Sequence, residues 1–174
     1  MAKLDLIDRK ILTELMNDAS LSVAVIADRV GLTQTPCWKR IQRLEAEGVV
    51  IRRVAIVDPA QVGLGLTAFV GIDAADHSEA WRSEFLDAIA EMPEIMEVHR
   101  LAGDVDYLLR VVVTDMLAFD AFYQRLTKRV RMKSVTSRFT METVRASTVY
   151  PLMAARQATG PVPTGRRHMS ATGP

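Results

Sequence analysis

The chain has 174 residues, of which 49% are hydrophobic and 25% are charged, as is typical of globular proteins. This length suits one ordinary domain or two small ones and excludes a large multidomain enzyme. The formal net charge of +1 does not by itself indicate a nucleic-acid-binding protein. The chain has one cysteine, a charged N-terminal stretch unlike a signal peptide, and no apolar run of about 20 residues, so we expect a soluble, cytoplasmic protein with no membrane partner.

Residues 4–48 have the apolar spacing of three short helices. In the first helix, Asp5 and Asp8 stand where the free N–H groups and positive dipole end of a first turn favour carboxylates. The second helix is expected to begin after the cap residue Ser22 and to end at Gly31, because glycine is common directly after a helix. These signals predict a small helical domain.

The third helix carries a basic surface. It is expected to begin at Thr33 or Thr35 and to run to Gly48, and the tight glycine-containing turn before it is typical of a helix-turn-helix unit. Residues 29–53 hold four more basic than acidic residues, which favours a nucleic-acid interface over a solvated face. The basic residues are Arg29, Lys39, Arg40, Arg43, Arg52 and Arg53. Trp38 lies beside them and is open to interpretation as a core, dimer or DNA-contacting residue.

The pattern changes after this region. An apolar, β-branched run at 49–57, interrupted by two arginines, predicts a strand or small wing that ends at Asp58-Pro59. From Leu66 onward the order is β-α-β-β-α-β, the arrangement of ferredoxin-like domains. The expected strands are 66–72, 95–100, 107–113 and 134–144, and the expected helices are 81–92 and 119–130. Two helices on one face of this sheet leave its other face to be covered, most simply by a second copy of the chain.

The segment between the two middle strands allows two interpretations. Gly103, Asp104 and Asp106 could form a hairpin turn, in which glycine supplies a positive φ and aspartate bonds the backbone. Alternatively, the glycine permits close approach of a ligand while a carboxylate binds the ligand's ammonium group. The two interpretations are compatible with each other.

No catalytic or metal-binding motif stands out in the sequence. Cys37 has no histidine or basic neighbour placed to lower its pKa, so we expect a small buried apolar residue. The three histidines lie far apart without a second ligand at metal spacing, and no phosphate loop or catalytic triad is recognisable. We therefore expect neither enzymatic activity nor a cofactor or metal.

Four sequence segments together resemble the Lrp/AsnC (leucine-responsive and asparagine-synthesis regulator) family of transcription factors, over about residues 3–150. They are LDLIDRKIL at 4–12, the stretch 30–51 that ends in Gly48-Val49-Val50-Ile51, HRLAGDVDYLLRV at 99–111, and FTMETV at 139–144. Several matches in the right order are far more specific than one motif.

This resemblance implies an α+β protein with an N-terminal winged helix-turn-helix that reads double-stranded DNA and a ferredoxin-like βαββαβ domain that binds an effector. It divides the chain into a DNA-binding domain at 1–50, a linker strand at 51–65, and an effector and oligomerisation domain at 66–152. Residues 153–174 contain glycine, proline and alanine without apolar periodicity, so we expect a disordered tail there. Dimers would form through the sheet and assemble further, commonly to octamers. An amino acid or related metabolite would bind between dimers.

The resemblance also assigns site residues. The expected DNA-binding residues are Gln34, Thr35, Trp38, Lys39, Arg40 and Arg43. The expected effector-binding residues are Ala102, Gly103, Asp104, Asp106, Met116, Arg138, Phe139 and Thr140. Arg138 and Thr140 are polar where the leucine-responsive member is apolar or aromatic, so leucine is not the expected effector.

Two other functions share this architecture. Some sirohaem decarboxylases resemble it, and His99 and Arg100 would then be candidate catalytic groups, although the basic third helix argues against an enzyme. The second alternative is an architectural DNA-binding protein that responds to no ligand. Stabilisation by one amino acid of a panel would separate an effector-responsive regulator from an architectural protein.

Overall fold

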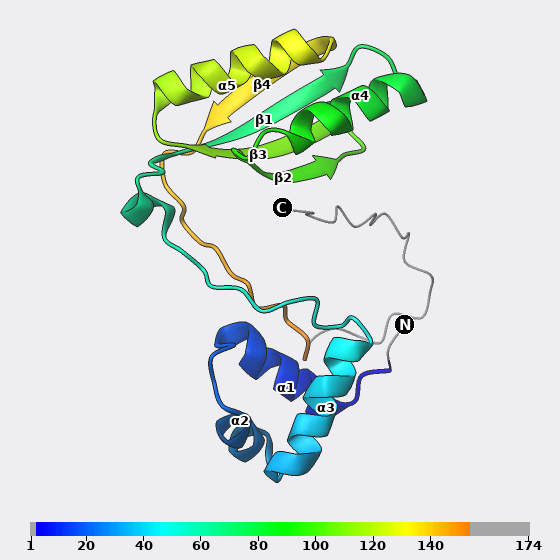
Figure 1. Ribbon diagram of the computed structural model, residues 1–174, viewed down its shortest axis with the longest axis vertical. Helices are drawn as coiled ribbons and strands as arrows, with labels where there is room; N and C mark the ends of the chain where they lie inside the picture. Colours follow the sequence, from blue (N-terminus) through cyan, green and yellow to red (C-terminus); the bar gives the residue numbers. More distant parts are fainter. Residues whose placement is uncertain (1–2, 154–174) are drawn as a thin grey trace. The chain divides into compact units, whose positions relative to one another are not determined.

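A computed structural model describes residues 3–153 of the chain (Figure 1). These residues form two compact units. The first contains residues 3–54 together with 147–153, and the second contains residues 55–146. The chain therefore leaves the first unit once, forms the second, and then returns to the first.

The first unit is built from the three helices that the sequence predicts. They are α1 (Leu6–Asn17), α2 (Val23–Val30) and α3 (Gln34–Ala46). Helix α1 begins with a capping box, in which the Asp5 carboxylate accepts from the N–H of Asp8 and the Asp8 carboxylate accepts from the N–H of Asp5. Ser22 caps α2, and Gly31 ends α2 at φ +76°, a left-handed conformation that favours glycine.

Helix α3 differs from its expected bounds at its C-terminus. Its N-cap is Thr33 rather than Thr35, without a side-chain capping bond. It ends at Ala46, with Glu47 as the C-cap and Gly48 at φ +68° beyond it. One face of α3 packs on α1 and α2 around Ile11, Ile26 and Ile41, which are at most 1% exposed. Each such side chain contributes roughly 1.5–3 kcal/mol to folding by its burial.

The strand expected at 49–57 is not formed. Residues 51–57 are exposed and have no strand assignment, and a short 3₁₀ helix, Pro59–Val62, follows them. A β-branched run has the propensity for a strand, but a strand also needs a neighbouring backbone to bond with. No such partner is present for residues 51–57 within residues 3–153.

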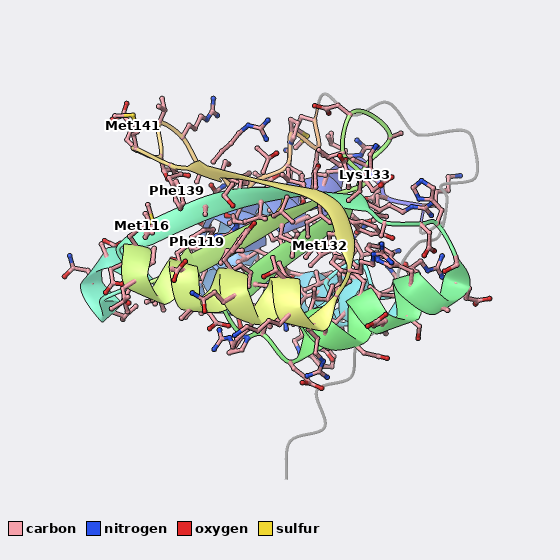
Figure 2. The ribbon with its side chains drawn as sticks, turned by 90° about the horizontal axis from the view of Figure 1, so that it is seen from above. Met116, Phe119, Met132, Lys133, Phe139 and Met141 are labelled. Atoms are coloured by element: carbon pink, nitrogen blue, oxygen red, sulfur yellow. The ribbon has the colours of Figure 1, made fainter. Side chains whose placement is uncertain are left out.

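The second unit has the expected βαββαβ order. Its elements are β1 (Leu66–Ala74), α4 (Glu79–Ala90), β2 (Ile95–Arg100), β3 (Tyr107–Val113), α5 (Met116–Arg129) and β4 (Met132–Phe139). The four strands form one antiparallel sheet in the order β2-β3-β1-β4, and both helices cover the same face of it (Figures 1 and 2). Buried side chains of Phe85, Leu109 and Phe122 fill the space between helices and sheet.

Strand β4 is shorter than the sequence predicts. It ends at Phe139, which pairs with Ala68 near the start of β1, and one further bond joins the N–H of Thr140 to the carbonyl of Thr67. Residues 141–144 extend past the beginning of β1 and are exposed. The expected extension to residue 144 is therefore wrong, because β1 supplies no backbone for those residues to bond with.

Candidate DNA-binding surface and effector site

Helix α3 buries one face and exposes the other. Cys37, Ile41 and Leu44 lie on the buried face, at the spacing of one side of a helix. The opposite side is marked by Thr35 and Lys39, both exposed. Cys37 is the buried apolar residue that we expected, and this burial raises the pKa of its thiol.

The expected DNA-binding residues fall into two groups. Gln34, Thr35, Trp38 and Lys39 are all exposed along the first two turns of α3. Trp38 is 50% exposed, which decides against the interpretation of this residue as part of the core. The side chain of Lys39 has no hydrogen bond or ion pair with any residue between 3 and 153, so its ammonium group is available to a phosphate.

Arg40 and Arg43 form the second group, and their guanidinium groups are bound to α1. Nη1 of Arg40 lies 2.6 Å from Oδ2 of Asp5 and 2.7 Å from Oδ1 of Asp8, and Nη2 of Arg43 lies 2.6 Å from Oδ2 of Asp8. Hydrogen bonds and charge attraction from Asp5 and Asp8 raise the pKa of Arg40. Both arginine side chains remain partly exposed, so they lie outside the apolar core while their guanidinium groups are paired with Asp5 and Asp8.

Other basic residues of this region are also paired. Arg29 bonds to Glu14 of α1 at 2.8 Å, and Arg53 bonds to Glu45 of α3 at 2.8 Å. The local excess of positive charge in the sequence is thus partly neutralised by carboxylates of α1. A charge balance over 29–53 alone leaves out the α1 carboxylates, because they lie earlier in the chain.

The loop 101–106 joins β2 to β3, and we call it the effector loop after the role expected for its residues. Ala102, Gly103 and Asp104 are exposed, whereas Asp106 is bonded into the fold. Oδ2 of Asp106 accepts from the N–H of Ala74 at 2.8 Å, and its own N–H donates to the carbonyl of Ile72. Gly103 does not have a positive φ, and a Cβ at this position would meet no atom within 4 Å. Glycine is therefore not required here by the backbone conformation.

A pocket of about 300 Å³ lies beside Asp106. Its lining combines acidic and basic groups, since it includes carboxylates from Asp106 and the start of α4 as well as two arginines. The lining residues are Asp76, His77, Ser78, Glu79, Trp81, Arg82, Arg100, Asp106 and Tyr107. Nδ1 of His77 lies 3.9 Å from Oδ1 of Asp106. Of the expected effector-binding residues, only Asp106 lines this pocket.

Met116, at the start of α5, and Phe139, at the end of β4, lie away from this pocket. Figure 2 shows both side chains at the same end of α5 and β4, away from Met132 and Lys133 at the other end of the strand. The ring of Phe139 meets that of Phe119 edge-on, with centroids 4.8 Å apart. Next to it, Thr140 has a buried Oγ1 that finds no hydrogen-bond partner among residues 3–153.

Arg138 lies on the opposite face of the sheet. It pairs with Phe69 of β1. Because neighbouring residues of a strand point to opposite faces, Phe69 lies on the exposed face of the sheet, opposite the buried Ala68 and Val70. A Cβ at Gly71 would lie 3.8 Å from Nη1 of Arg138 and 3.3 Å from Cγ1 of Val105, so the arginine reaches toward the effector loop. The expected effector residues therefore do not form one cluster within a single chain.

Sequence reasoning did not identify Arg82 and Arg100 as ligand-binding candidates. The sequence suggests only a catalytic role for Arg100, under the decarboxylase alternative, and no pattern in the sequence brings Arg82 next to the effector loop. Across residues 3–153, no group of three or more potential ligand side chains is arranged to hold a metal ion. Within the same range, no helix has the length and apolar character needed to cross a membrane.

A helix-turn-helix unit joined to a ferredoxin-like domain is the architecture of a transcriptional regulator with a ligand-binding domain. Residues 4–51 match the family model for winged helix-turn-helix DNA-binding domains, and residues 67–150 match the model for the Lrp/AsnC ligand-binding domain. The chain belongs to the Lrp/AsnC family of transcriptional regulators. The family resemblance and the fold class expected from the sequence are confirmed.

Known relatives agree with this assignment. The chain is 48% identical to the DNA-binding transcriptional activator DecR of Escherichia coli strain K12, over 86% of this chain and 99% of that protein. It is similar to the crystal structure of an AsnC family regulator from Agrobacterium tumefaciens, with 48% identity and a TM-score of 0.83, covering 86% and 98% of the two chains.

A third relative was solved with a ligand. It is a transcriptional regulator from Neisseria meningitidis in complex with L-methionine, 32% identical, with a TM-score of 0.83 and coverage of 86% and 97%. These relatives are regulators and not enzymes, which favours regulation over the decarboxylase alternative. The chain is a DNA-binding transcriptional regulator of this family.

Proposed function

We propose that an amino acid or a closely related metabolite binds in the pocket beside Asp106 and alters the assembly of this regulator or its affinity for DNA. The observation that carries the proposal is the mixture of charges in the pocket. The ligand's carboxylate would bind Arg82 or Arg100, and its ammonium group would bind a carboxylate such as Asp106. A volume of about 300 Å³ suits a small ligand.

In this proposal, another copy of the chain contributes the remaining expected effector residues to the site. Met116, Phe139 and Thr140 lie at one end of the effector domain, and the effector loop lies elsewhere on it. A ligand held between dimers would meet the loop of one copy and these residues of another. Pairing through the exposed sheet face into dimers, and assembly of dimers to an octamer, supply such contacts.

For DNA binding, we propose that a dimer places two α3 helices in successive major grooves. Thr35 and Gln34 would lie near base edges, Lys39 would bind a phosphate, and Trp38 would pack beside the backbone. Bound effector can shift an equilibrium between assemblies only by its difference in affinity for them, typically about 1–3 kcal/mol. Activation and repression both fit this mechanism.

Tryptophan fluorescence tests the effector site directly. The chain has two tryptophans, and Trp81 lines the pocket, so a Trp38→Phe variant reports on the pocket alone. We expect one or a few of the twenty amino acids to change the Trp81 emission and to raise thermal stability. In that background, Arg100→Ala should lower the affinity for the ligand at least tenfold. Lys128→Ala changes an exposed residue of α5 outside the pocket and should leave this affinity unchanged.

Two results would contradict the proposal. One is that no amino acid changes the emission or the stability. The other is that a bound amino acid is insensitive to replacement of Arg82, Arg100 and Asp106 alike. DNA binding without any ligand response would then favour the architectural alternative.

A further inference from the structure

Asp8 is the one buried charged residue among residues 3–153, with 0% of its surface exposed. Both oxygens of its carboxylate accept hydrogen bonds. Oδ1 accepts from Nη1 of Arg40 at 2.7 Å, and Oδ2 accepts from Nη2 of Arg43 at 2.6 Å and from the N–H of Asp5 at 3.1 Å. One carboxylate of α1 thus holds two arginines of α3, which lie 32 and 35 residues further along the chain.

We propose that Asp8 is a positioning residue for DNA recognition. It fixes the rotation of α3 on α1 through Arg40 and Arg43, and these arginines support recognition through the helix orientation rather than by binding phosphates themselves. The inference rests on the proposed use of the exposed side of α3, around Thr35 and Lys39, as the surface that meets DNA.

The contacts of α3 explain why it needs such a device. The apolar contacts of Cys37, Ile41 and Leu44 bury surface but contain no directional bond, because the hydrophobic effect is non-directional. Charge-assisted hydrogen bonds are short and directional. Arg40 and Arg43 stand three residues apart on one flank of α3, between its buried and exposed sides. A rotation of α3 that displaced Lys39 would also pull both guanidinium groups away from Asp8.

The experiment compares two DNA duplexes for each full-length variant. One is the tightest duplex that the wild-type protein selects from a random pool, and the other is a scrambled duplex of the same composition. Affinities for both are measured across a salt series, well below the melting temperature. Partial unfolding lowers both affinities equally, so the ratio between the duplexes reports on recognition rather than on stability.

We expect Asp8→Asn to lower the affinity for the selected duplex at least tenfold, with less than a twofold change for the scrambled duplex. Arg40→Lys should also lower the ratio, because the lysine side chain is shorter and cannot place a donor where Nη1 bridges Asp5 and Asp8. The combined Asp8→Asn and Arg40→Lys variant should be no worse than either single change. The salt dependence should keep its wild-type slope in all three.

Opposite results would overturn the inference. If Arg40 and Arg43 bind phosphates, Arg40→Gln and Arg43→Gln will each reduce the salt slope by about one unit, and Arg40→Lys will behave like wild type. Should Asp8→Asn fail to fold, Arg40→Lys alone decides between the two outcomes. Lys39→Ala tests whether the exposed side of α3 contacts DNA. If this variant keeps the wild-type DNA affinity and salt dependence, that side of α3 is not the DNA-contacting surface, whatever the role of Asp8.

Discussion

The carboxylate of Asp106 accepts a hydrogen bond from the backbone N–H of Ala74, with 2.8 Å between Oδ2 and N. This bond joins the effector loop to the end of β1, and it separates two aspartates that sequence alone leaves equivalent. Asp104, two residues earlier, is exposed and makes no such bond. Asp106 therefore braces the loop, and only its other oxygen faces His77 in the pocket.

We expect Asp106→Ala to lower the free energy of unfolding by about 1.5 kcal/mol, because a hydrogen bond to a charged group is lost. Asp104→Ala is the matched control and should change it by less than about 0.5 kcal/mol. Urea denaturation of both variants measures the difference. Equal effects of the two changes would show that the bond to Ala74 does not support the loop.

The joint change Arg40→Ala and Arg43→Ala should destabilise the first unit by about 3 kcal/mol, because it leaves the buried Asp8 carboxylate without its cations. The lower end of the usual range applies since both guanidinium groups are partly exposed. Arg52→Ala, at an exposed residue, is the control. Thermal unfolding followed by circular dichroism gives the comparison. If the joint variant is as stable as Arg52→Ala, the pairs with Asp8 contribute nothing to folding.

The segment 147–152 should stabilise the DNA-binding unit. Leu152 packs against the helical core and its carbonyl accepts from Nη1 of Arg9, while Oγ1 of Thr148 donates to the carbonyl of Met16. A chain ending at residue 146 should unfold its first unit at lower denaturant, by about 1–2 kcal/mol, mainly through the lost burial of Leu152. A chain ending at residue 153 keeps these contacts and should match the full chain. Identical unfolding of both truncations would contradict this role.

Asp5 should make stability depend on pH. The N–H of Asp8, and secondarily Arg40, hold the pKa of the Asp5 carboxyl below its ordinary value of 3.8. A carboxyl whose pKa is lower in the folded state contributes stability above its unfolded pKa and loses that contribution as the pH falls through the folded value. Asp5→Asn should therefore lose less stability than wild type between pH 6 and pH 3. Denaturation midpoints of both proteins, determined at each pH, measure this difference. Asp104→Asn is the exposed control, and an acid response of Asp5→Asn equal to wild type would contradict the assignment.

Local patterns predict local structure well in this chain. Ser22 and Gly31 bound α2 as expected, since caps act within one turn, and the alternation from Leu66 to Ile72 places β1 correctly. The strand expected at 49–57 fails because a strand also depends on a distant backbone. The ion pairs of Arg40 and Arg43 are missed for a related reason, since their partner Asp8 comes more than thirty residues earlier.

The candidate effector site shows the same limit. A loop containing Gly103 and Asp106 is visible in the sequence as a motif, and its position after β2 is predicted correctly. Arg82 of α4 joins it only through the antiparallel sheet, which brings the start of α4 next to the start of β3. Spacing along the chain contains no signal for such a neighbour, because Arg82 lies more than twenty residues before Asp106, with β2 between α4 and β3.

The return of residues 147–153 to the helices makes the effector domain an insertion within the DNA-binding unit. A contiguous N-terminal segment of about fifty residues is therefore not the whole DNA-binding module. Domain-exchange chimeras that take only residues 1–54 from this protein discard Leu152 and leave its contact surface on the helices open. Exchange of the effector domain is better made with two junctions, near residues 54 and 147, so that both ends of the insert change together and the recipient keeps its own helical core complete.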